Sequence, residues 1–156
     1  MRGLALAAVC LMRVLALSAP DAVGAALAQA VASAHDLADR LSMSDPAAGA
    51  RELEAALEAP FPKGEPSRAL RLDLFAHASE RHLAAKDSAL ALASARRGLA
   101  EEKGHAPDRL TAQLVLKEAE ALEASGDEPG AVQAYSKAIA IARRLLAERG
   151  SKEAAP

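Results

Sequence analysis

Aromatic residues and cysteine are scarce in this chain of 156 residues, which holds one Tyr, two Phe, no Trp and one Cys. β-strands are enriched in aromatic and β-branched side chains, so the shortage of rings disfavours a β-sandwich or a β-barrel. A single cysteine excludes an intrachain disulfide and any metal site that is built from several thiolates.

An excess charge of either sign is also missing, because 19 basic residues stand against 21 acidic ones and the net charge is −2. We therefore expect no nucleic-acid binding through a basic surface. Alanine and leucine dominate instead, with 42 and 23 copies, and both rank high in helix propensity. The hydrophobic fraction of 51% is too high for a disordered chain, so the composition predicts a folded, all-α protein.

The first 25 residues have the layout of a secretory signal peptide. A short basic start precedes an apolar run, and small residues follow at two sites that suit cleavage, before Ala26 and before Gln29. Arg13 interrupts the apolar run, which is shorter than the roughly 20 residues of a membrane-spanning helix. We expect a cleaved leader over 1–25 and a periplasmic or secreted protein without a membrane span. The alternative is a retained helix that packs on the domain of a cytoplasmic protein.

Similar alanine-rich segments recur along the rest of the chain with a period of 40–42 residues. Asp45, Asp87 and Asp127 each open one of these segments. When the three segments are aligned on these aspartates, small and apolar residues occupy matching positions in each segment. Within a segment these positions, such as Ala131 and Ala138, are spaced so that they lie on one face of a helix. Repeats of this length indicate stacked helix pairs that share a continuous core.

Capping and helix-breaking residues divide each repeat into two helices. The three aspartates are suited to cap helix N-termini, and Pro- and Gly-rich stretches separate the repeats. The predicted architecture is about three antiparallel helix pairs over 26–149, with no strand and with a disordered tail over 150–156. The expected helices are 22–43, 46–59, 67–85, 87–103, 107–125 and 128–149.

The last helix pair resembles a tetratricopeptide repeat over residues 107–145. Small residues let two helices approach to about 8–10 Å, and one ring fills the gap that remains. The residues that match these packing positions of the family are Ala119, Leu122, Ala131, Tyr135 and Ala138. The period is longer than the usual 34 residues of the family, and the earlier repeats have Leu53 and Ala95 in place of Tyr135. The resemblance implies a right-handed α-α solenoid.

Two of the four histidines, His35 and His77, occupy equivalent positions in successive repeats. Asp73, His77 and Glu80 share one helix face because they lie at positions i, i+4 and i+7. Imidazole and carboxylate groups are transition-metal ligands, so a metal site between two helices is conceivable. However, the third repeat has Lys117 at the equivalent position, and no two histidines are spaced i, i+4. We therefore expect a line of polar groups and no metal site.

Catalytic motifs are not recognisable in the sequence. Serines such as Ser79 stand among helix-forming residues with no base at motif spacing, and Cys10 lies in the expected leader. The segment 126–130 lacks the lysine and the spacing of a phosphate-binding loop. We expect no enzymatic activity and no cofactor, and we expect His82 and His105 at the surface or in loops.

The resemblance also implies a concave groove, lined by the first helix of each pair, that binds another protein. The residues expected to line it are mixed in charge and mainly acidic: His35, Asp73, His77, Glu80, Gln113, Lys117, Glu120 and Glu123. Some members of the family clamp a partner's C-terminal carboxylate with Lys, Arg and Asn. Here only Lys117 is basic and the chain contains no Asn, so the expected ligand is a peptide or helix with basic character.

The predicted function is therefore that of a non-enzymatic protein-interaction scaffold in an exported bacterial protein. A self-associating structural or regulatory helical bundle is the competing interpretation. A metal-binding helical protein is a third interpretation, with less support from the sequence.

Overall fold

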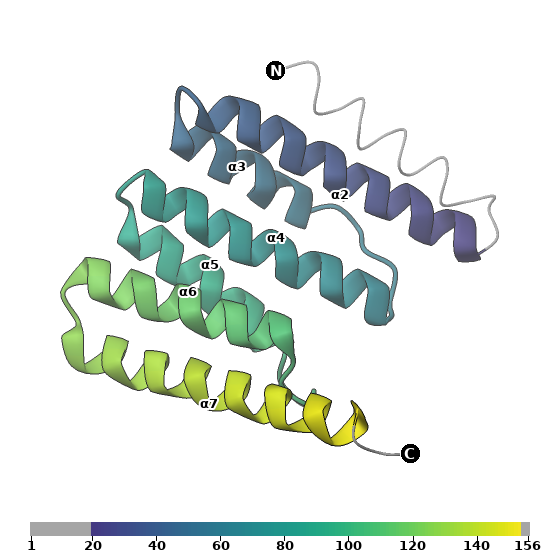
Figure 1. The fold of residues 1–156 in the computed structure, drawn as a ribbon. Coiled ribbons are helices and arrows are strands. Elements are labelled where there is room, and N and C mark those ends of the chain that lie inside the picture. Colours follow the sequence, from purple (N-terminus) through teal and green to yellow (C-terminus); the bar gives the residue numbers. More distant parts are fainter. Residues whose placement is uncertain (1–19, 154–156) are drawn as a thin grey trace.

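The computed structural model describes residues 20–153, and every regular element in this part of the chain is an α-helix. The all-α prediction is confirmed, and the helices lie side by side in sequence order, each antiparallel to the next (Figure 1). None of the described helices combines the length and the apolar character that are needed to cross a membrane. The helices are α2 (Pro20–Ser42), α3 (Pro46–Leu57), α4 (Glu65–Ala84), α5 (Ser88–Glu101), α6 (Arg109–Ser125) and α7 (Glu128–Glu153).

The two ends of the helical region differ from the expected boundaries. α2 begins at Pro20, two residues before the expected helix start at residue 22 and ahead of the expected domain start at residue 26, and proline is well tolerated in the first turn of a helix. The expected leader falls mostly on residues 1–19, which lie outside the described part of the chain. At the other end α7 continues to Glu153, so 150–153 are helical instead of disordered. Gly150 alone does not end the helix, and the next proline is Pro156.

Aspartates cap the helices where the sequence predicts it. The carboxylate of Asp45 accepts a hydrogen bond from the backbone N–H of a first-turn residue, and Asp87 and Asp127 do the same for α5 and α7. A fourth cap, not predicted, is Asp108 at the start of α6. Asp108 accepts a 2.9 Å bond from the Thr111 N–H, while the Thr111 hydroxyl accepts a 3.0 Å bond from the Asp108 N–H. This reciprocal capping box explains where α6 begins.

Each helix packs against the next one in the sequence. In addition, α4 contacts both α2 and α6. By contrast, the backbones of α3, α5 and α7 do not approach one another closely within the described residues, although the Ser94 side chain of α5 reaches Glu54 of α3. One buried cluster joins α2, α3, α4 and α6 around Phe75, which is 1% exposed. A second buried cluster lies between α6 and α7. The two clusters form a core that extends along the stack.

Two glycines mark points where helices approach very closely. A Cβ atom at Gly49 in α3 would lie 2.6 Å from the backbone oxygen of Ala38 in α2. At Gly98 in α5 it would lie 2.9 Å from a methyl group of Leu114 and 3.0 Å from Cβ of Phe75. At these points only a hydrogen atom fits between the helices.

The residues that carry the tetratricopeptide resemblance lie where α6 packs on α7. Ala119, Leu122, Ala131 and Ala138 are buried in this contact. Tyr135 packs against the same cluster but is only partly buried, and its hydroxyl donates a 2.5 Å hydrogen bond to Oε2 of Glu123. The ring therefore lies at the edge of the contact instead of being enclosed by it. The bond to Glu123 raises the pKa of Tyr135 to about 12.

Candidate functional site

Most of the expected groove residues lie on one face that α2, α4 and α6 share. α4 lies between the other two helices and contacts both. Ion pairs cross each of these contacts, and they join Asp39 to Arg81 between α2 and α4 and Glu80 to Lys117 between α4 and α6. His35 of α2 also lies beside Asp73 of α4. We call this surface the α2–α4–α6 face. Its described members are His35, Asp39, Asp73, His77, Glu80, Arg81, Gln113, Lys117 and Glu120.

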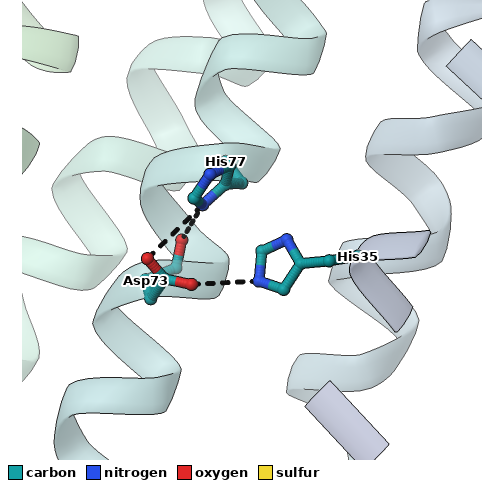
Figure 2. A group of neighbouring side chains, drawn as sticks. All are labelled: His35, Asp73 and His77. Carbon is teal, nitrogen blue, oxygen red and sulfur yellow. Dashed lines mark hydrogen bonds and ion pairs between the residues drawn. The ribbon is translucent and has the colours of Figure 1, made fainter. Parts of the chain in front are cut away.

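The centre of this face between α2 and α4 is a cluster of His35, Asp73 and His77. Figure 2 shows His35 reaching from α2 toward the carboxylate of Asp73, which lies beside His77 on α4. Nε2 of His35 is 3.0 Å from Oδ2 of Asp73, and Nδ1 of His77 is 3.6 Å from Oδ1. The two rings meet edge to face, with their centroids 4.5 Å apart. The cluster therefore gathers two imidazoles around one carboxylate.

The polar atoms of the cluster are not all satisfied. Nδ1 of His77 lies 2.9 Å from the backbone oxygen of Asp73, one helical turn earlier. Nε2 of His35 is buried, and despite its short distance to Asp73 it makes no hydrogen bond of acceptable angle. The imidazole of His35 is the main influence that lowers the pKa of Asp73, burial opposes this effect, and His77 adds to it. The net effect of these neighbours is a lowered pKa of Asp73.

The α6 side of the face carries a second group of charges. Nζ of Lys117 lies 3.0 Å from Oε2 of Glu120 on its own helix and 3.8 Å from Oε2 of Glu80 on α4. Gln113 is partly buried on the same helix. Glu123 differs from the expectation, because it bonds Tyr135 of α7 and so lies toward that helix rather than with the others.

Three residues of this region were missed or misplaced by the sequence reasoning. Asp39 of α2 and Arg81 of α4 form an ion pair. The sequence could have indicated this, because Asp39 follows His35 and Arg81 follows His77 by four residues, which places each on the same helix face as its histidine. His82 was expected at the surface but is buried in the last turn of α4. Its Nε2 lies 3.2 Å from Oε1 of Glu54, whereas its buried Nδ1 makes no hydrogen bond. His105 is exposed in the loop after α5, as expected.

A second polar region lies where the connections before α4 and before α6 meet. Arg68 of α4 forms ion pairs with Glu65, with the buried Glu102 and with Asp108. Glu102 also accepts a hydrogen bond from the Thr111 hydroxyl. These bonds raise the pKa of Arg68, with the largest contribution from Glu65. The network ties the start of α4 to the start of α6.

Beside this network lies a depression of about 430 Å³, whose lining includes Phe61, Lys63, Arg68, Arg71, Glu101 and His105. Both arginines that line this depression already have partners within the protein. Arg71 pairs with Glu101, donates to the Leu57 carbonyl at 3.1 Å and lies 5.0 Å from the centre of the Phe61 ring. We therefore assign these arginines to holding the helices together.

The buried serines have structural partners. The Ser79 hydroxyl donates a 2.9 Å bond to the Ala91 carbonyl, which links α4 to α5. Ser94 donates to the carboxylate of Glu54. The chain matches no protein-family model, and no curated protein or solved structure is significantly similar to it, so the tetratricopeptide resemblance rests on the residues themselves.

Proposed function

We propose that the chain is a right-handed α-α solenoid of the tetratricopeptide kind that acts as a non-enzymatic binding module. Its ligand is a peptide or helix of a partner protein, and the α2–α4–α6 face is the binding surface. The observation that carries the proposal is an asymmetry in packing. The backbones of α2, α4 and α6 approach one another in order, whereas those of α3, α5 and α7 do not do so within the described residues.

This asymmetry favours a curved stack. When one row of helices is in contact and the other row is separated, the layers fan out toward the separated row. The α2–α4–α6 side then becomes the concave side, which is the usual binding surface of helical solenoids. Side chains from three successive helices can thus contact one extended ligand.

The charge on this face supports a basic ligand. Its carboxylates are Asp39, Asp73, Glu80 and Glu120, and its cations are Arg81 and Lys117. Both cations already pair with carboxylates of the face, which leaves the net charge negative. Complementary charge speeds association and selects against acidic competitors. The proposed ligand therefore carries Lys or Arg side chains along one side.

A peptide-display selection with the full chain as bait tests this proposal. We expect the enriched peptides to be basic and to lose affinity by about tenfold or more when the bait is the Glu80→Lys/Glu120→Lys variant, because like charges then oppose each other. The matched control is Glu58→Lys/Glu148→Lys, which makes the same change in net charge at an exposed position directly after α3 and at one on α7.

The outcome separates a binding face from general attraction between opposite charges. Equal loss of affinity in both double variants would mean that only net charge matters. Unchanged affinity in the Glu80/Glu120 variant would place the ligand elsewhere and overturn the proposal. Binding that weakens with added salt in the wild type agrees with charge complementarity at an exposed surface.

Self-association is a second candidate function, and one observation favours it. Val132, Ile139 and Leu146 on α7 are 64%, 52% and 67% exposed, and they recur every seven residues. This spacing is that of a coiled-coil seam. The proposed occupant of the stripe is α7 of a second copy. Antiparallel pairing centred on Ile139 would set Val132 of each copy opposite Leu146 of the other.

Sedimentation at increasing concentration tests this second candidate. We expect a dimer that becomes monomeric in Ile139→Glu and persists in the control Gln133→Glu, which places the same charge at an exposed position six residues away in the sequence. A wild-type chain that stays monomeric at high concentration removes the self-association proposal.

A further inference from the structure

The His35–Asp73–His77 cluster has a composition that suits a metal ion. Each residue offers one ligand atom, and these atoms all lie within 4.8 Å of one another. Two imidazole nitrogens and one carboxylate oxygen form a ligand set that zinc and related ions commonly use in proteins. The three side chains come from two helices, so an ion bound there would link α2 to α4.

We propose that His35, Asp73 and His77 form a binding site for a divalent transition-metal ion, with Zn²⁺ as the preferred ion. The sequence led us to expect no metal here, because Lys117 occupies the equivalent position in the third repeat. The structure confines the cluster to the first two repeats and engages Lys117 with Glu120 and Glu80. The proposal stands independently of the peptide-binding function.

Two distances in the cluster can be compared with those of a bound zinc site. Tetrahedral zinc with ligands at about 2.0–2.2 Å holds neighbouring ligand atoms roughly 3.3–3.5 Å apart. Here Nε2 of His35 is 3.0 Å from Oδ2 of Asp73, and Nδ1 of His77 is 3.6 Å from Oδ1. These two distances end on different oxygens of Asp73, and the three ligand atoms lie within 4.8 Å of one another. The side chains would therefore have to rotate to bring one atom of each residue around the same ion.

The hydrogen bonding of the cluster points to a ligand as well. Nε2 of His35 is buried and makes no hydrogen bond, which is uncommon for a polar atom in a folded protein. In the neutral ring with its proton on Nδ1, this nitrogen would offer a lone pair to an ion. In His77, by contrast, Nδ1 already lies within hydrogen-bond distance of the Asp73 carbonyl. This contact has to be given up before Nδ1 can bind the ion, which limits the affinity of the site for the metal.

The surroundings of Asp73 leave it free to act as the anionic ligand. Among the described residues, His35 and His77 are the side chains that lower the pKa of its carboxyl group. Arg81, one turn after His77, pairs with Asp39, and Lys117 pairs with glutamates. The side chains of the cluster remain 21–35% exposed, so an ion can enter from solvent and a water molecule can complete the tetrahedron.

Calorimetric titration of the full chain, without any histidine tag, with ZnCl₂ tests the proposal. We expect one ion per chain and an affinity that falls about 100-fold or more in His35→Gln, Asp73→Asn or His77→Gln, since even loss of a supporting group around a metal site commonly weakens binding by 10–100-fold. Co²⁺ in place of Zn²⁺ should give the visible absorption bands of tetrahedral coordination. The control is His105→Gln, which changes an exposed histidine outside the cluster.

A thermal-unfolding series supplies the second measurement. Zn²⁺ should raise the midpoint of the wild type and of His105→Gln, because a ligand that binds the folded state stabilises it. It should leave the midpoint of Asp73→Asn unchanged, and the near-isosteric amide keeps this variant folded for the comparison. Absence of 1:1 binding in the wild type, or equal binding in the wild type and the three cluster variants, would overturn the proposal.

Discussion

Removal of the Arg68 side chain should destabilise the protein more than removal of any exposed cation. Arg68 is 13% exposed and Glu102, its partner, is 5% exposed, so this ion pair is almost completely withdrawn from water. In Arg68→Met the carboxylate of Glu102 keeps only the hydrogen bond from the Thr111 hydroxyl. Loss of one partner of a buried pair costs about 3–5 kcal/mol, because a buried charge is left uncompensated.

Urea denaturation measures this effect. With a slope of about 2 kcal/mol per molar urea, the unfolding midpoint of Arg68→Met should fall by roughly 1.5–2.5 M. The control is Arg51→Met, which removes an exposed ion pair with Asp45, and it should cost less than about 1 kcal/mol. Addition of Glu102→Gln to Arg68→Met should recover a large part of the loss, since the amide is neutral and still accepts from Thr111.

The double variant and the control decide between two explanations. If Arg68→Met loses no more stability than Arg51→Met, the network at the start of α4 does not anchor α6, and the reasoning from burial is refuted. If Glu102→Gln deepens the loss instead of reversing it, the unpaired charge is not the cause.

Two further predictions concern close packing and pH. Gly49→Ala should lower the free energy of unfolding by about 1–3 kcal/mol or more, because the new Cβ would lie 2.6 Å from the Ala38 carbonyl oxygen. The control is Gly24→Ala, which has open space around it and should raise the free energy of unfolding by up to about 1 kcal/mol. Thermal unfolding measures both changes. Tyr135 is the single tyrosine, so its ultraviolet absorbance at alkaline pH should report a pKa near 12. Below pH 10 its phenol is protonated in both the folded and the unfolded state. Between pH 10 and 12 only the unfolded chain loses the proton, so stability should fall over this window in the wild type, and this contribution should be absent in Tyr135→Phe. A normal tyrosine titration near pH 10 would contradict the bond to Glu123.

The helices were predictable from the sequence because their ends are encoded locally. Asp45, Asp87 and Asp127 each bond backbone groups within three residues, so the signal lies within one helical turn. The equivalence of His35 and His77 was also visible, since it follows from the repeat. What the repeat alone did not show is that Asp73 brings the two histidines together, because this depends on the distance between α2 and α4.

Contacts between distant residues account for what could not be predicted. Arg68 pairs with Glu102 and Asp108, which lie 34 and 40 residues further along the chain, and charged helix residues are usually solvated. His82 was expected at the surface or in a loop. Its burial depends on Glu54, which reaches it from a different helix.

The position of α4 has a consequence for how the molecule opens. This helix packs against α2, α3, α5 and α6, whereas α7 packs only against α6 among the described helices. Local unfolding starts where few contacts hold a segment, so backbone amides of α7 and α2 should exchange with deuterium before those of α4. Local unfolding of the described helices would then begin at both ends of the stack and reach α4 last. Bound zinc would join α2 to the slowest-exchanging helix and so make exchange at the N-terminal end of the described helices slower than at the C-terminal end.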